Sequence, residues 1–383
     1  MLQQQVRAED IRDVLLAHSD AGAVHFFCPT ALDQRLAEFR RGFPGLVTFA
    51  VKSNPQDAVI TRLCQGGIDG FDVASPDEIA QVSRLCPGRP MHYNNPVRSR
   101  AEIRAGIAAG VVSWSIDTLS ELQKLIDAGI ADDAEVAVRF KLPVAGAAYH
   151  FGAKFGATEE EAVDLLRAVG ASGRRPAITF HVGTQCADPQ AWVAYIQAAA
   201  RIERAAGVRC LRLNVGGGFP SARHGAAPLE PFFAAIRGAM SAFDTRPVLV
   251  CEPGRGLVAD AFALAVQVKS IRGQAIYLTD GIYGGLSEMV NLAAPALAVL
   301  SAEGVWRNGP VIERPAFGPT CDSLDLLKHP LPLPATIAEG DWIVLRSMGA
   351  YVTGVTTRFN GYGDVAAVTV SLLDAPYAVT GQA

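Results

Sequence analysis

The segment LVTFAVKSNPQDAVITRLCQGGIDGFDVASPDEIAQV, residues 46–82, decides the fold of this chain. It contains two short runs rich in β-branched and aromatic residues, and each is followed by a stretch whose apolar residues recur every three or four positions. That spacing is typical of a helix that buries one face. Ser75-Pro-Asp-Glu78 forms a capping box, which marks a helix start. The segment therefore predicts two consecutive strand–helix units.

The same alternation of β-rich and helical stretches continues as far as residue 258. The eight predicted strands are 46–52, 70–75, 91–95, 112–117, 135–140, 178–183, 211–216 and 248–252. Eight strand–helix alternations favour an α/β fold, a (β/α)8 TIM-type barrel, over an open sheet.

The pattern changes after residue 259, where helical periodicity fades and short β-rich runs stand between turns. This predicts a C-terminal antiparallel β domain. An early β-rich run at 24–27 could pair into that domain. We therefore expect a barrel of residues 30–258 and a discontinuous β domain made of residues 1–29 together with 259–383.

Composition limits the functions open to the chain. Of its 383 residues, 50% are hydrophobic and 19% are charged, which allows a sizeable core and excludes global disorder. The net charge is −4 and there is no basic stripe, so we expect no binding of nucleic acid or anionic membranes. No apolar run is long enough for a membrane span, and the acidic beginning of the chain is unlike a secretory signal. These features predict a cytoplasmic protein.

The seven cysteines are scattered and include no CxxC pair, and the seven histidines show no metal-binding spacing. We therefore expect neither a disulfide framework nor a metal site.

Strand parity places polar residues inside the predicted barrel. Side chains alternate between the two faces of a strand, and the greasy face of each run is paired with a small or polar one. The polar inner residues near the carboxyl ends of the strands are Lys52, Asp72, Asp117, Arg139 and His181. Barrel enzymes keep their active sites at that end.

Two loops and one lysine indicate a phosphate-bearing cofactor. Gly216-Gly-Gly-Phe-Pro220 follows the seventh strand and Glu252-Pro-Gly-Arg255 follows the eighth, where barrels habitually bind phosphate. A glycine triplet alone could be a mere tight turn, and Lys52 alone could be a surface lysine. Together they favour a Schiff-base lysine that holds pyridoxal phosphate.

At this point the sequence resembles the fold-type-III pyridoxal-phosphate decarboxylases, the ornithine, lysine, arginine and diaminopimelate group, and most closely the ornithine/lysine branch. The resemblance covers nearly the whole chain and implies the barrel of alanine racemases with a β domain. The matching segments are FAVKSNP (49–55), GFDVASPDEI (70–79), FHVGTQC (180–186), NVGGGFP (214–220), CEPGRGLVADA (251–261), TDGIYGG (279–285), GPTCDSLD (318–325) and MGAYVTGVTTRFNGY (348–362).

The resemblance implies a role for each residue around the cofactor. Lys52 would form the Schiff base, His181 would stack on the pyridine ring, and Glu252 would keep the ring nitrogen protonated. Alanine racemases carry an arginine at the position of Glu252, so a glutamate there favours a decarboxylase. The remaining cofactor-binding residues implied are Asp72, Arg139, Thr184, Gly217, Gly218, Gly254, Arg255 and Tyr351.

The resemblance also implies a shared active site in a head-to-tail homodimer. Cys321 would protonate the α-carbon after carbon dioxide leaves, and Asp322 would face the distal amine of an amino-acid substrate across the interface. Tyr283 would lie with the substrate as well.

One element of the family pattern is missing. Ornithine decarboxylases carry Tyr-Asp-His where this chain reads Met289-Val-Asn-Leu-Ala293, so one expected anion for the distal amine is absent. We expect decarboxylation of a basic amino acid, with a substrate that departs from plain ornithine. The alternatives are a decarboxylase or racemase acting on a modified, carrier-bound or less cationic amino acid, and a non-catalytic binding protein such as the antizyme inhibitors. Retention of Lys52, Cys321 and the phosphate loops argues against the last alternative.

Overall fold

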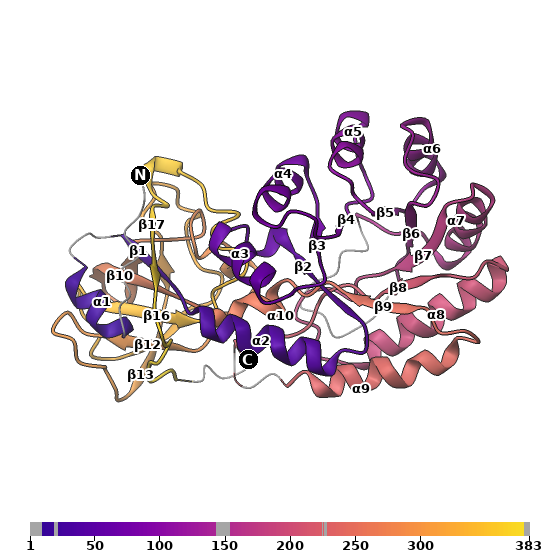
Figure 1. Cartoon of the computed structure of the whole chain (residues 1–383). Helices are drawn as coiled ribbons and strands as arrows, with labels where there is room; N and C mark the ends of the chain where they lie inside the picture. Colours follow the sequence, from indigo (N-terminus) through magenta and orange to yellow (C-terminus); the bar gives the residue numbers. More distant parts are fainter. Residues whose placement is uncertain (1–9, 19–21, 143–153, 224, 226–227, 379–383) are drawn as a thin grey trace. The chain divides into compact units, whose positions relative to one another are not determined.

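The computed structural model describes residues 10–18, 22–142, 154–223, 225 and 228–378. The chain forms two compact units (Figure 1). We call them the barrel unit, residues 36–220 and 228–257, and the β unit, residues 1–35, 221–227 and 258–383. No helix among the described residues is both long and apolar enough to cross a membrane.

Eight parallel strands close into a barrel, as the alternation predicts. The order around the barrel follows the sequence, and β9 pairs with β2 to close it. The barrel strands are β2 (Leu46–Ala50), β3 (Gly70–Val73), β4 (Met91–Tyr93), β5 (Ser113–Ile116), β6 (Glu135–Arg139), β7 (Arg175–Thr179), β8 (Arg212–Asn214) and β9 (Val248–Cys251).

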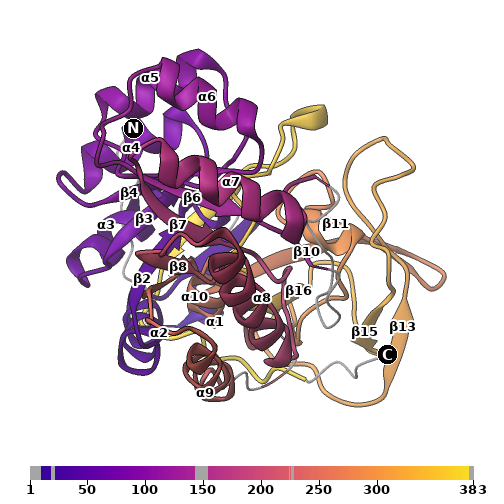
Figure 2. The same ribbon diagram turned by 90° about the vertical axis from the view of Figure 1, so that its right-hand side faces the viewer.

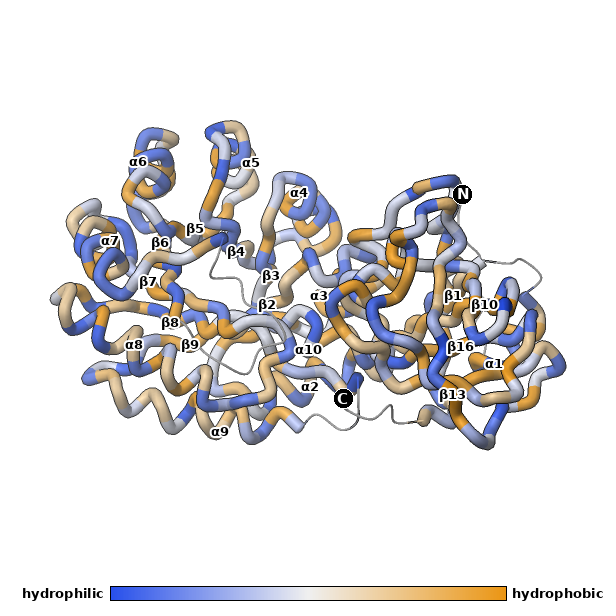
Figure 3. The backbone as a smooth tube through the Cα atoms, turned by 180° about the vertical axis from the view of Figure 1, so that it is seen from behind, coloured by the Kyte–Doolittle hydropathy of each residue, from blue (hydrophilic) through white to orange (hydrophobic). Residues whose placement is uncertain are grey.

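The α-helices of the barrel unit lie outside its strands (Figures 1 and 2). Polar and apolar colours alternate around the turns of α4, α5 and α6, as one buried face requires (Figure 3). The α-helices described in the chain are α1 (Ile11–Ala17), α2 (Pro29–Gly42), α3 (Asp57–Gln65), α4 (Pro76–Leu85), α5 (Arg100–Ala108), α6 (Leu119–Asp127), α7 (Glu159–Ala171), α8 (Gln190–Ala206), α9 (Glu230–Ala239) and α10 (Arg255–Val258).

All eight barrel strands end earlier than the sequence predicts, and the ends of β2 and β7 bear on the site. β2 stops at Ala50, and Val51–Ser53 form a 3-10 turn, η1. β7 runs over Arg175–Thr179 because its first residues pair with β6, although arginine and proline are weak strand formers. Lys52 and His181 therefore stand just beyond strand ends, on turns that project from the carboxyl rim of the barrel.

The β unit contains a seven-stranded sheet whose longest path is β12-β16-β10-β1-β17. Most pairs are antiparallel, but β1–β17 and β11–β14 are parallel. A separate pair, β13 and β15, lies beside it (Figure 2). The strands are β1 (Ala23–Phe27), β10 (Phe262–Arg272), β11 (Ala275–Leu278), β12 (Leu297–Leu300), β13 (Val311–Arg314), β14 (Ala316–Phe317), β15 (Leu331–Pro334), β16 (Trp342–Arg346) and β17 (Val365–Thr369).

The sheet of the β unit is buried on both faces. Along β10, Leu264 and Val266 belong to one apolar cluster, whereas Ala263 and Ala265 belong to a second one that includes Ile11 of α1. A strand buried on both faces is apolar at every position, which explains the continuous run FALAV.

One expectation about the cysteines is wrong. Cys64 at the end of α3 and Cys86 after α4 are joined by a disulfide, with their Cα atoms 6.0 Å apart. The scattered spacing of the cysteines carries no signal for this pair, because the two cysteines meet only when neighbouring helices pack. The other five cysteines are free thiols.

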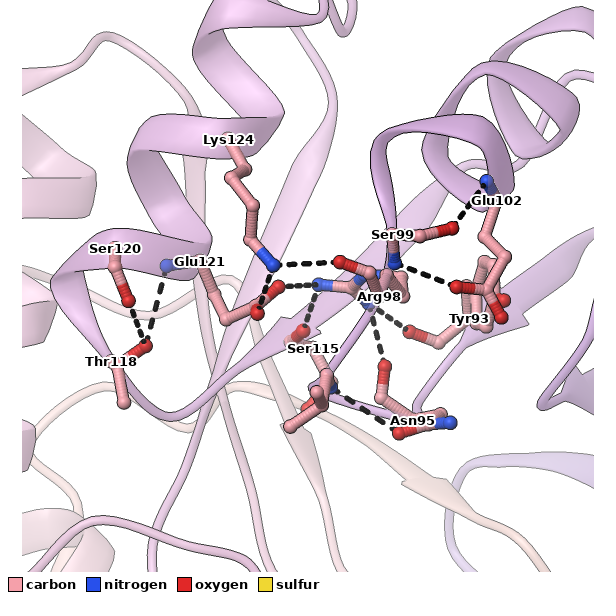
Figure 4. Close-up of polar contacts among 11 residues, drawn as sticks. Tyr93, Asn95, Arg98, Ser99, Glu102, Ser115, Thr118, Ser120, Glu121 and Lys124 are labelled. Atoms are coloured by element: carbon pink, nitrogen blue, oxygen red, sulfur yellow. Dashed lines mark hydrogen bonds and ion pairs between the residues drawn. The ribbon is translucent and has the colours of Figure 1, made fainter.

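A buried arginine fastens the ends of β4 and β5 together (Figure 4). The Arg98 guanidinium lies over the rings of Tyr93 and Trp114, 5.3 and 5.6 Å from their centroids. Its Nη2 donates to the carbonyl of Ser115 at 2.6 Å and lies 3.9 Å from Glu121 Oε2. Burial lowers the pKa of Arg98 to about 10, so the group remains charged at neutral pH.

We expect Arg98→Met to destabilise the barrel unit by about 3–5 kcal/mol, because it leaves several buried carbonyls without a donor and leaves the buried Glu121 with the partly exposed Lys124 as its cation. The matched control is Arg100→Met, whose guanidinium is exposed and pairs with Asp127 at 3.3 Å; we expect a change below about 1 kcal/mol. Urea unfolding followed by circular dichroism measures both. Equal effects of the two substitutions would contradict this prediction.

Candidate active site

Charged side chains converge where the barrel strands end. Lys52 follows β2, Asp72 lies on β3 and Arg139 ends β6. Lys52 Nζ lies 3.8 Å from Asp72 Oδ2; the lysine side chain is half exposed, whereas Asp72 is buried. The structure thus places an accessible amine beside a buried carboxylate at the carboxyl rim, where barrel enzymes carry their chemistry.

Glu252 follows β9 and is buried. Asn94, after β4, and Asn214, at the end of β8, both donate a hydrogen bond from Nδ2 to its Oε1. Burial raises the pKa of Glu252 to about 8, and the negative charge of Asp72 acts in the same direction. Burial also raises the pKa of Asp72, against the positive charges of Lys52 and Arg139. The buried acids Asp72 and Glu252 therefore both lie near the cations Lys52 and Arg139. Asn94 hydrogen bonds to both acids, and Asn214 hydrogen bonds to Glu252.

His181 is neutral in this setting. Burial lowers its pKa well below the ordinary value, and the positive charges of Lys52 and Arg139 act in the same direction. Its Nδ1 accepts a hydrogen bond from the Gly183 N–H at 3.0 Å, so in the neutral ring the proton belongs on Nε2. An uncharged imidazole with a fixed tautomer suits stacking on a flat ring.

The two glycine loops form a cradle lined by backbone. A Cβ on Gly218, where φ is +94°, would lie 2.4 Å from the carbonyl oxygen of Gly183. A Cβ on Gly217 would lie 2.7 Å from the carbonyl oxygen of Glu252, and one on Gly254 would lie 3.0 Å from Ser53 Cβ. Side chains are excluded here, as they are where backbone approaches a phosphate closely. Thr184 and Arg255, which we also predict as phosphate ligands, are buried.

Four predicted site residues belong to the β unit. The Tyr283 hydroxyl donates to Asp322 Oδ2, while Asp322 Oδ1 accepts from the Leu324 N–H at 2.9 Å. The Cys321 thiol is exposed, and its backbone N–H donates to Asn360 Oδ1 at 3.0 Å. Tyr351 has a φ of +56°, a left-handed conformation that is unusual for an aromatic residue.

Sequence reasoning gave Asp325 no role, yet this buried acid joins two loops of the β unit. Its Oδ1 accepts from the Ile282 N–H at 2.9 Å, and its Oδ2 accepts from the N–H and hydroxyl of Thr320 at 3.1 and 2.7 Å. It thereby holds the segment that carries Cys321 against the segment that carries Tyr283. The sequence signal available for Asp325 was that the motif GPTCDSLD contains a second acid besides Asp322.

Asn94 and Asn214 are the other residues that sequence reasoning left without a role. Asn214 falls on the polar face of its strand, between Arg212 and Gly216, so strand parity could have singled it out. Asn94 follows a strand of three residues, too short for parity to decide.

Comparison with known proteins identifies the family. The family model "Pyridoxal-dependent decarboxylase, pyridoxal binding domain" matches residues 30–259. A chloroplastic ornithine decarboxylase of Nicotiana glauca is 32% identical over 353 residues, 87% of this chain and 80% of the relative. An antizyme inhibitor 2 of Xenopus laevis is 29% identical over 350 residues, 85% of this chain and 75% of that protein. The structure of a Vibrio vulnificus lysine/ornithine decarboxylase complexed with putrescine has a TM-score of 0.80 at 26% identity, covering 95% of this chain and 99% of that one.

The chain belongs to the pyridoxal-dependent decarboxylases, and its cofactor is pyridoxal phosphate. The residues of the barrel unit fit that group. An amine, a buried carboxylate and a side-chain-free glycine cradle supply what its aldehyde, its ring nitrogen and its phosphate require.

We expect Gly218→Ala to weaken pyridoxal phosphate binding by about tenfold or more, because its Cβ would collide with the Gly183 carbonyl and close the cradle. The control is Gly173→Ala, which shares a positive φ, +78°, but has open space around the new Cβ. Absorbance titration of the apoenzyme with pyridoxal phosphate measures both affinities. If the two substitutions weaken binding equally, the cradle is not the phosphate site.

Proposed function

We propose that this chain decarboxylates a basic amino acid of the ornithine or lysine type, giving an amine and carbon dioxide. The observation that carries the proposal is the arrangement of Lys52 and the buried Glu252 at one barrel rim. A carboxylate opposite the ring nitrogen keeps that nitrogen protonated, and the protonated ring accepts the electrons left when the Cα–carboxylate bond breaks. The ornithine decarboxylase among the relatives supports the reaction class.

The residues of the barrel unit would hold the cofactor in three ways. Lys52 would bind its aldehyde, with Asp72 and Arg139 orienting the surrounding charges. His181 would cover one face of the ring through its neutral imidazole. The residues proposed to hold the phosphate are Thr184, Gly217, Gly218, Gly254, Arg255 and Tyr351.

The Cys321 thiol would supply the proton that replaces the departing carboxylate on the α-carbon. We propose that it acts in a head-to-tail homodimer, where the Cys321 segment of each subunit serves the site of the other. Its exposure in the single chain is consistent with that role.

Asp322 would receive the distal amine of the substrate. The hydrogen bond from Tyr283 holds the pKa of Asp322 below its ordinary value, so this carboxylate is ionised at neutral pH. Tyr283 would contact the substrate through the same pair. The stretch 289–293 offers no second acid, which supports a substrate other than plain ornithine, such as a longer, modified or less cationic amino acid.

The alternatives are weighed by particular residues. A racemase of this fold would place an arginine where Glu252 stands, which disfavours racemisation. The antizyme inhibitor among the relatives is the reason to weigh a non-catalytic binding protein as an alternative. Lys52, Cys321 and the glycine cradle are all present, and a chain that had lost cofactor binding would not need them.

The test of function starts from purified protein. We expect it to be yellow, to bleach with borohydride, and to release carbon dioxide from one or more members of a panel containing ornithine, lysine, diaminopimelate and glutamate-like substrates. Lys52→Ala should lose the borohydride-sensitive colour and the activity, whereas Lys328→Ala, at an exposed position of the β unit, should keep both. Colourless wild-type protein after incubation with pyridoxal phosphate would refute the proposal, and a clear preference for ornithine would refute the substrate inference.

A second prediction addresses the distal amine. We expect Asp322→Asn to raise KM for diamino-acid substrates about tenfold or more, with a smaller effect on kcat, because an ionised partner is lost. Glu313→Gln, an exposed acid on β13, is the matched control. Steady-state kinetics decide the matter: an unchanged KM would remove Asp322 from the substrate site.

A further inference from the structure

Asn214 links the two ends of the proposed cofactor site. Its Oδ1 accepts a hydrogen bond from the Gly216 N–H at 2.9 Å, at the start of the glycine cradle, while its Nδ2 donates to Glu252 Oε1. Because one end of the amide must be an acceptor, its orientation is fixed and the NH2 group faces the carboxylate. The side chain is buried, so neither hydrogen bond competes with bulk water.

Asn94 supplies the second donor to the same oxygen, Glu252 Oε1. Its side chain and its backbone N–H also hydrogen bond to Asp72, and both contacts lower the pKa of that acid. Asn94 therefore lies between two buried carboxylates that repel each other. Both amides donate to Oε1, and neither donates to Oε2.

Arg98 fixes the backbone on both sides of Asn94. Its Nη1 donates to the carbonyl of Tyr93 at 3.0 Å and to the carbonyl of Asn95 at 2.8 Å (Figure 4). These carbonyls belong to the residues directly before and after Asn94. The buried guanidinium therefore restrains the peptide units that set the direction of the Asn94 side chain.

We infer that Asn94 and Asn214 are positioning residues that keep the shared proton on the ring nitrogen of the cofactor rather than on Glu252. The inference rests on the role proposed above for Glu252. A hydrogen bond donated to a carboxylate stabilises its ionised form and makes it a weaker base. The two donors oppose the burial and the nearby Asp72, both of which make Glu252 a stronger base.

The other charges facing Glu252 come from three elements. Asp72 on β3 raises the pKa of Glu252, while Lys52 on η1 and Arg139 on β6 lower it. Replacing Asn214 removes no hydrogen bond to any of these three groups, so a change in the position of the proton in that variant can be assigned to the lost amide. Asn94 also hydrogen bonds to Asp72, so its replacement removes a contact that lowers the pKa of Asp72 as well.

The experiment uses holoenzyme reconstituted with pyridoxal phosphate labelled with nitrogen-15 in the ring, and the chemical shift of that atom reports its protonation. The variants are Asn94→Ala, Asn214→Ala and the near-isosteric Asn94→Asp, and the matched control is Asn95→Ala, the adjacent asparagine. Each lost donor should move the balance of the proton from nitrogen toward Glu252 by about tenfold to a hundredfold, equivalent to about one to two pKa units. Circular dichroism checks that each variant folds.

Each outcome is decisive. Protonated nitrogen in the wild type and in Asn95→Ala, with a shift toward unprotonated nitrogen in the three variants, supports the inference. A nitrogen that stays equally protonated in folded Asn94→Ala, Asn94→Asp and Asn214→Ala overturns it while leaving the proposed function intact. An unprotonated nitrogen in the wild type overturns the role of Glu252 itself, and the inference falls with it.

Discussion

The proposed chemistry of this chain depends on the proton balance of one carboxylate that is buried inside a barrel. Burial of Glu252 opposes its charge, and Asp72 adds repulsion at the same rim. Lys52 and Arg139, from two other elements, lower the pKa of Glu252, and two amides donate hydrogen bonds to one of its oxygens. Even with these partners the pKa of Glu252 is raised to about 8, so burial outweighs them in the cofactor-free chain. In the proposed function, a protonated ring nitrogen beside Glu252 would supply the further positive charge that ionises this acid, and the electron sink would depend on that balance.

The rest of the barrel rim serves that balance by limiting movement. Arg98 ties β4 to β5 behind Asn94, and Asn214 ties the glycine cradle to Glu252. The backbone N–H of Glu252 also donates to the Gly216 carbonyl at 2.9 Å. The glycine cradle, which is the proposed phosphate site, and Glu252, the proposed partner of the ring nitrogen, are thus joined by both a side chain and the backbone, so a shift in one would disturb the other.

The sequence predicted the elements whose patterns are local and failed where contacts are distant. The barrel followed from strand–helix alternation, and Lys52, Asp72, Arg139 and Glu252 followed from strand parity and motif. Asn94 could not be assigned, because its role arises from Glu252, far away in the chain. The Cys64–Cys86 disulfide and the Asp325 contacts were not predicted, for the same reason. The start of β7 was misplaced because pairing with β6 overrides the weak strand propensity of Pro176.

The two units divide the work in a way that bears on substrate choice. The proposed cofactor chemistry relies on groups in the barrel unit such as Asp72, Asn214 and Glu252. These side chains are buried and hydrogen-bonded, so substituting them costs stability. The proposed substrate contacts, Tyr283 and Asp322, are partly exposed and lie on loops of the β unit that Asp325 holds together. Partly exposed loop residues tolerate substitution better than buried networks do. Loss of the second acid near 289–293 can therefore alter the substrate while the electron chemistry of the barrel stays as it was.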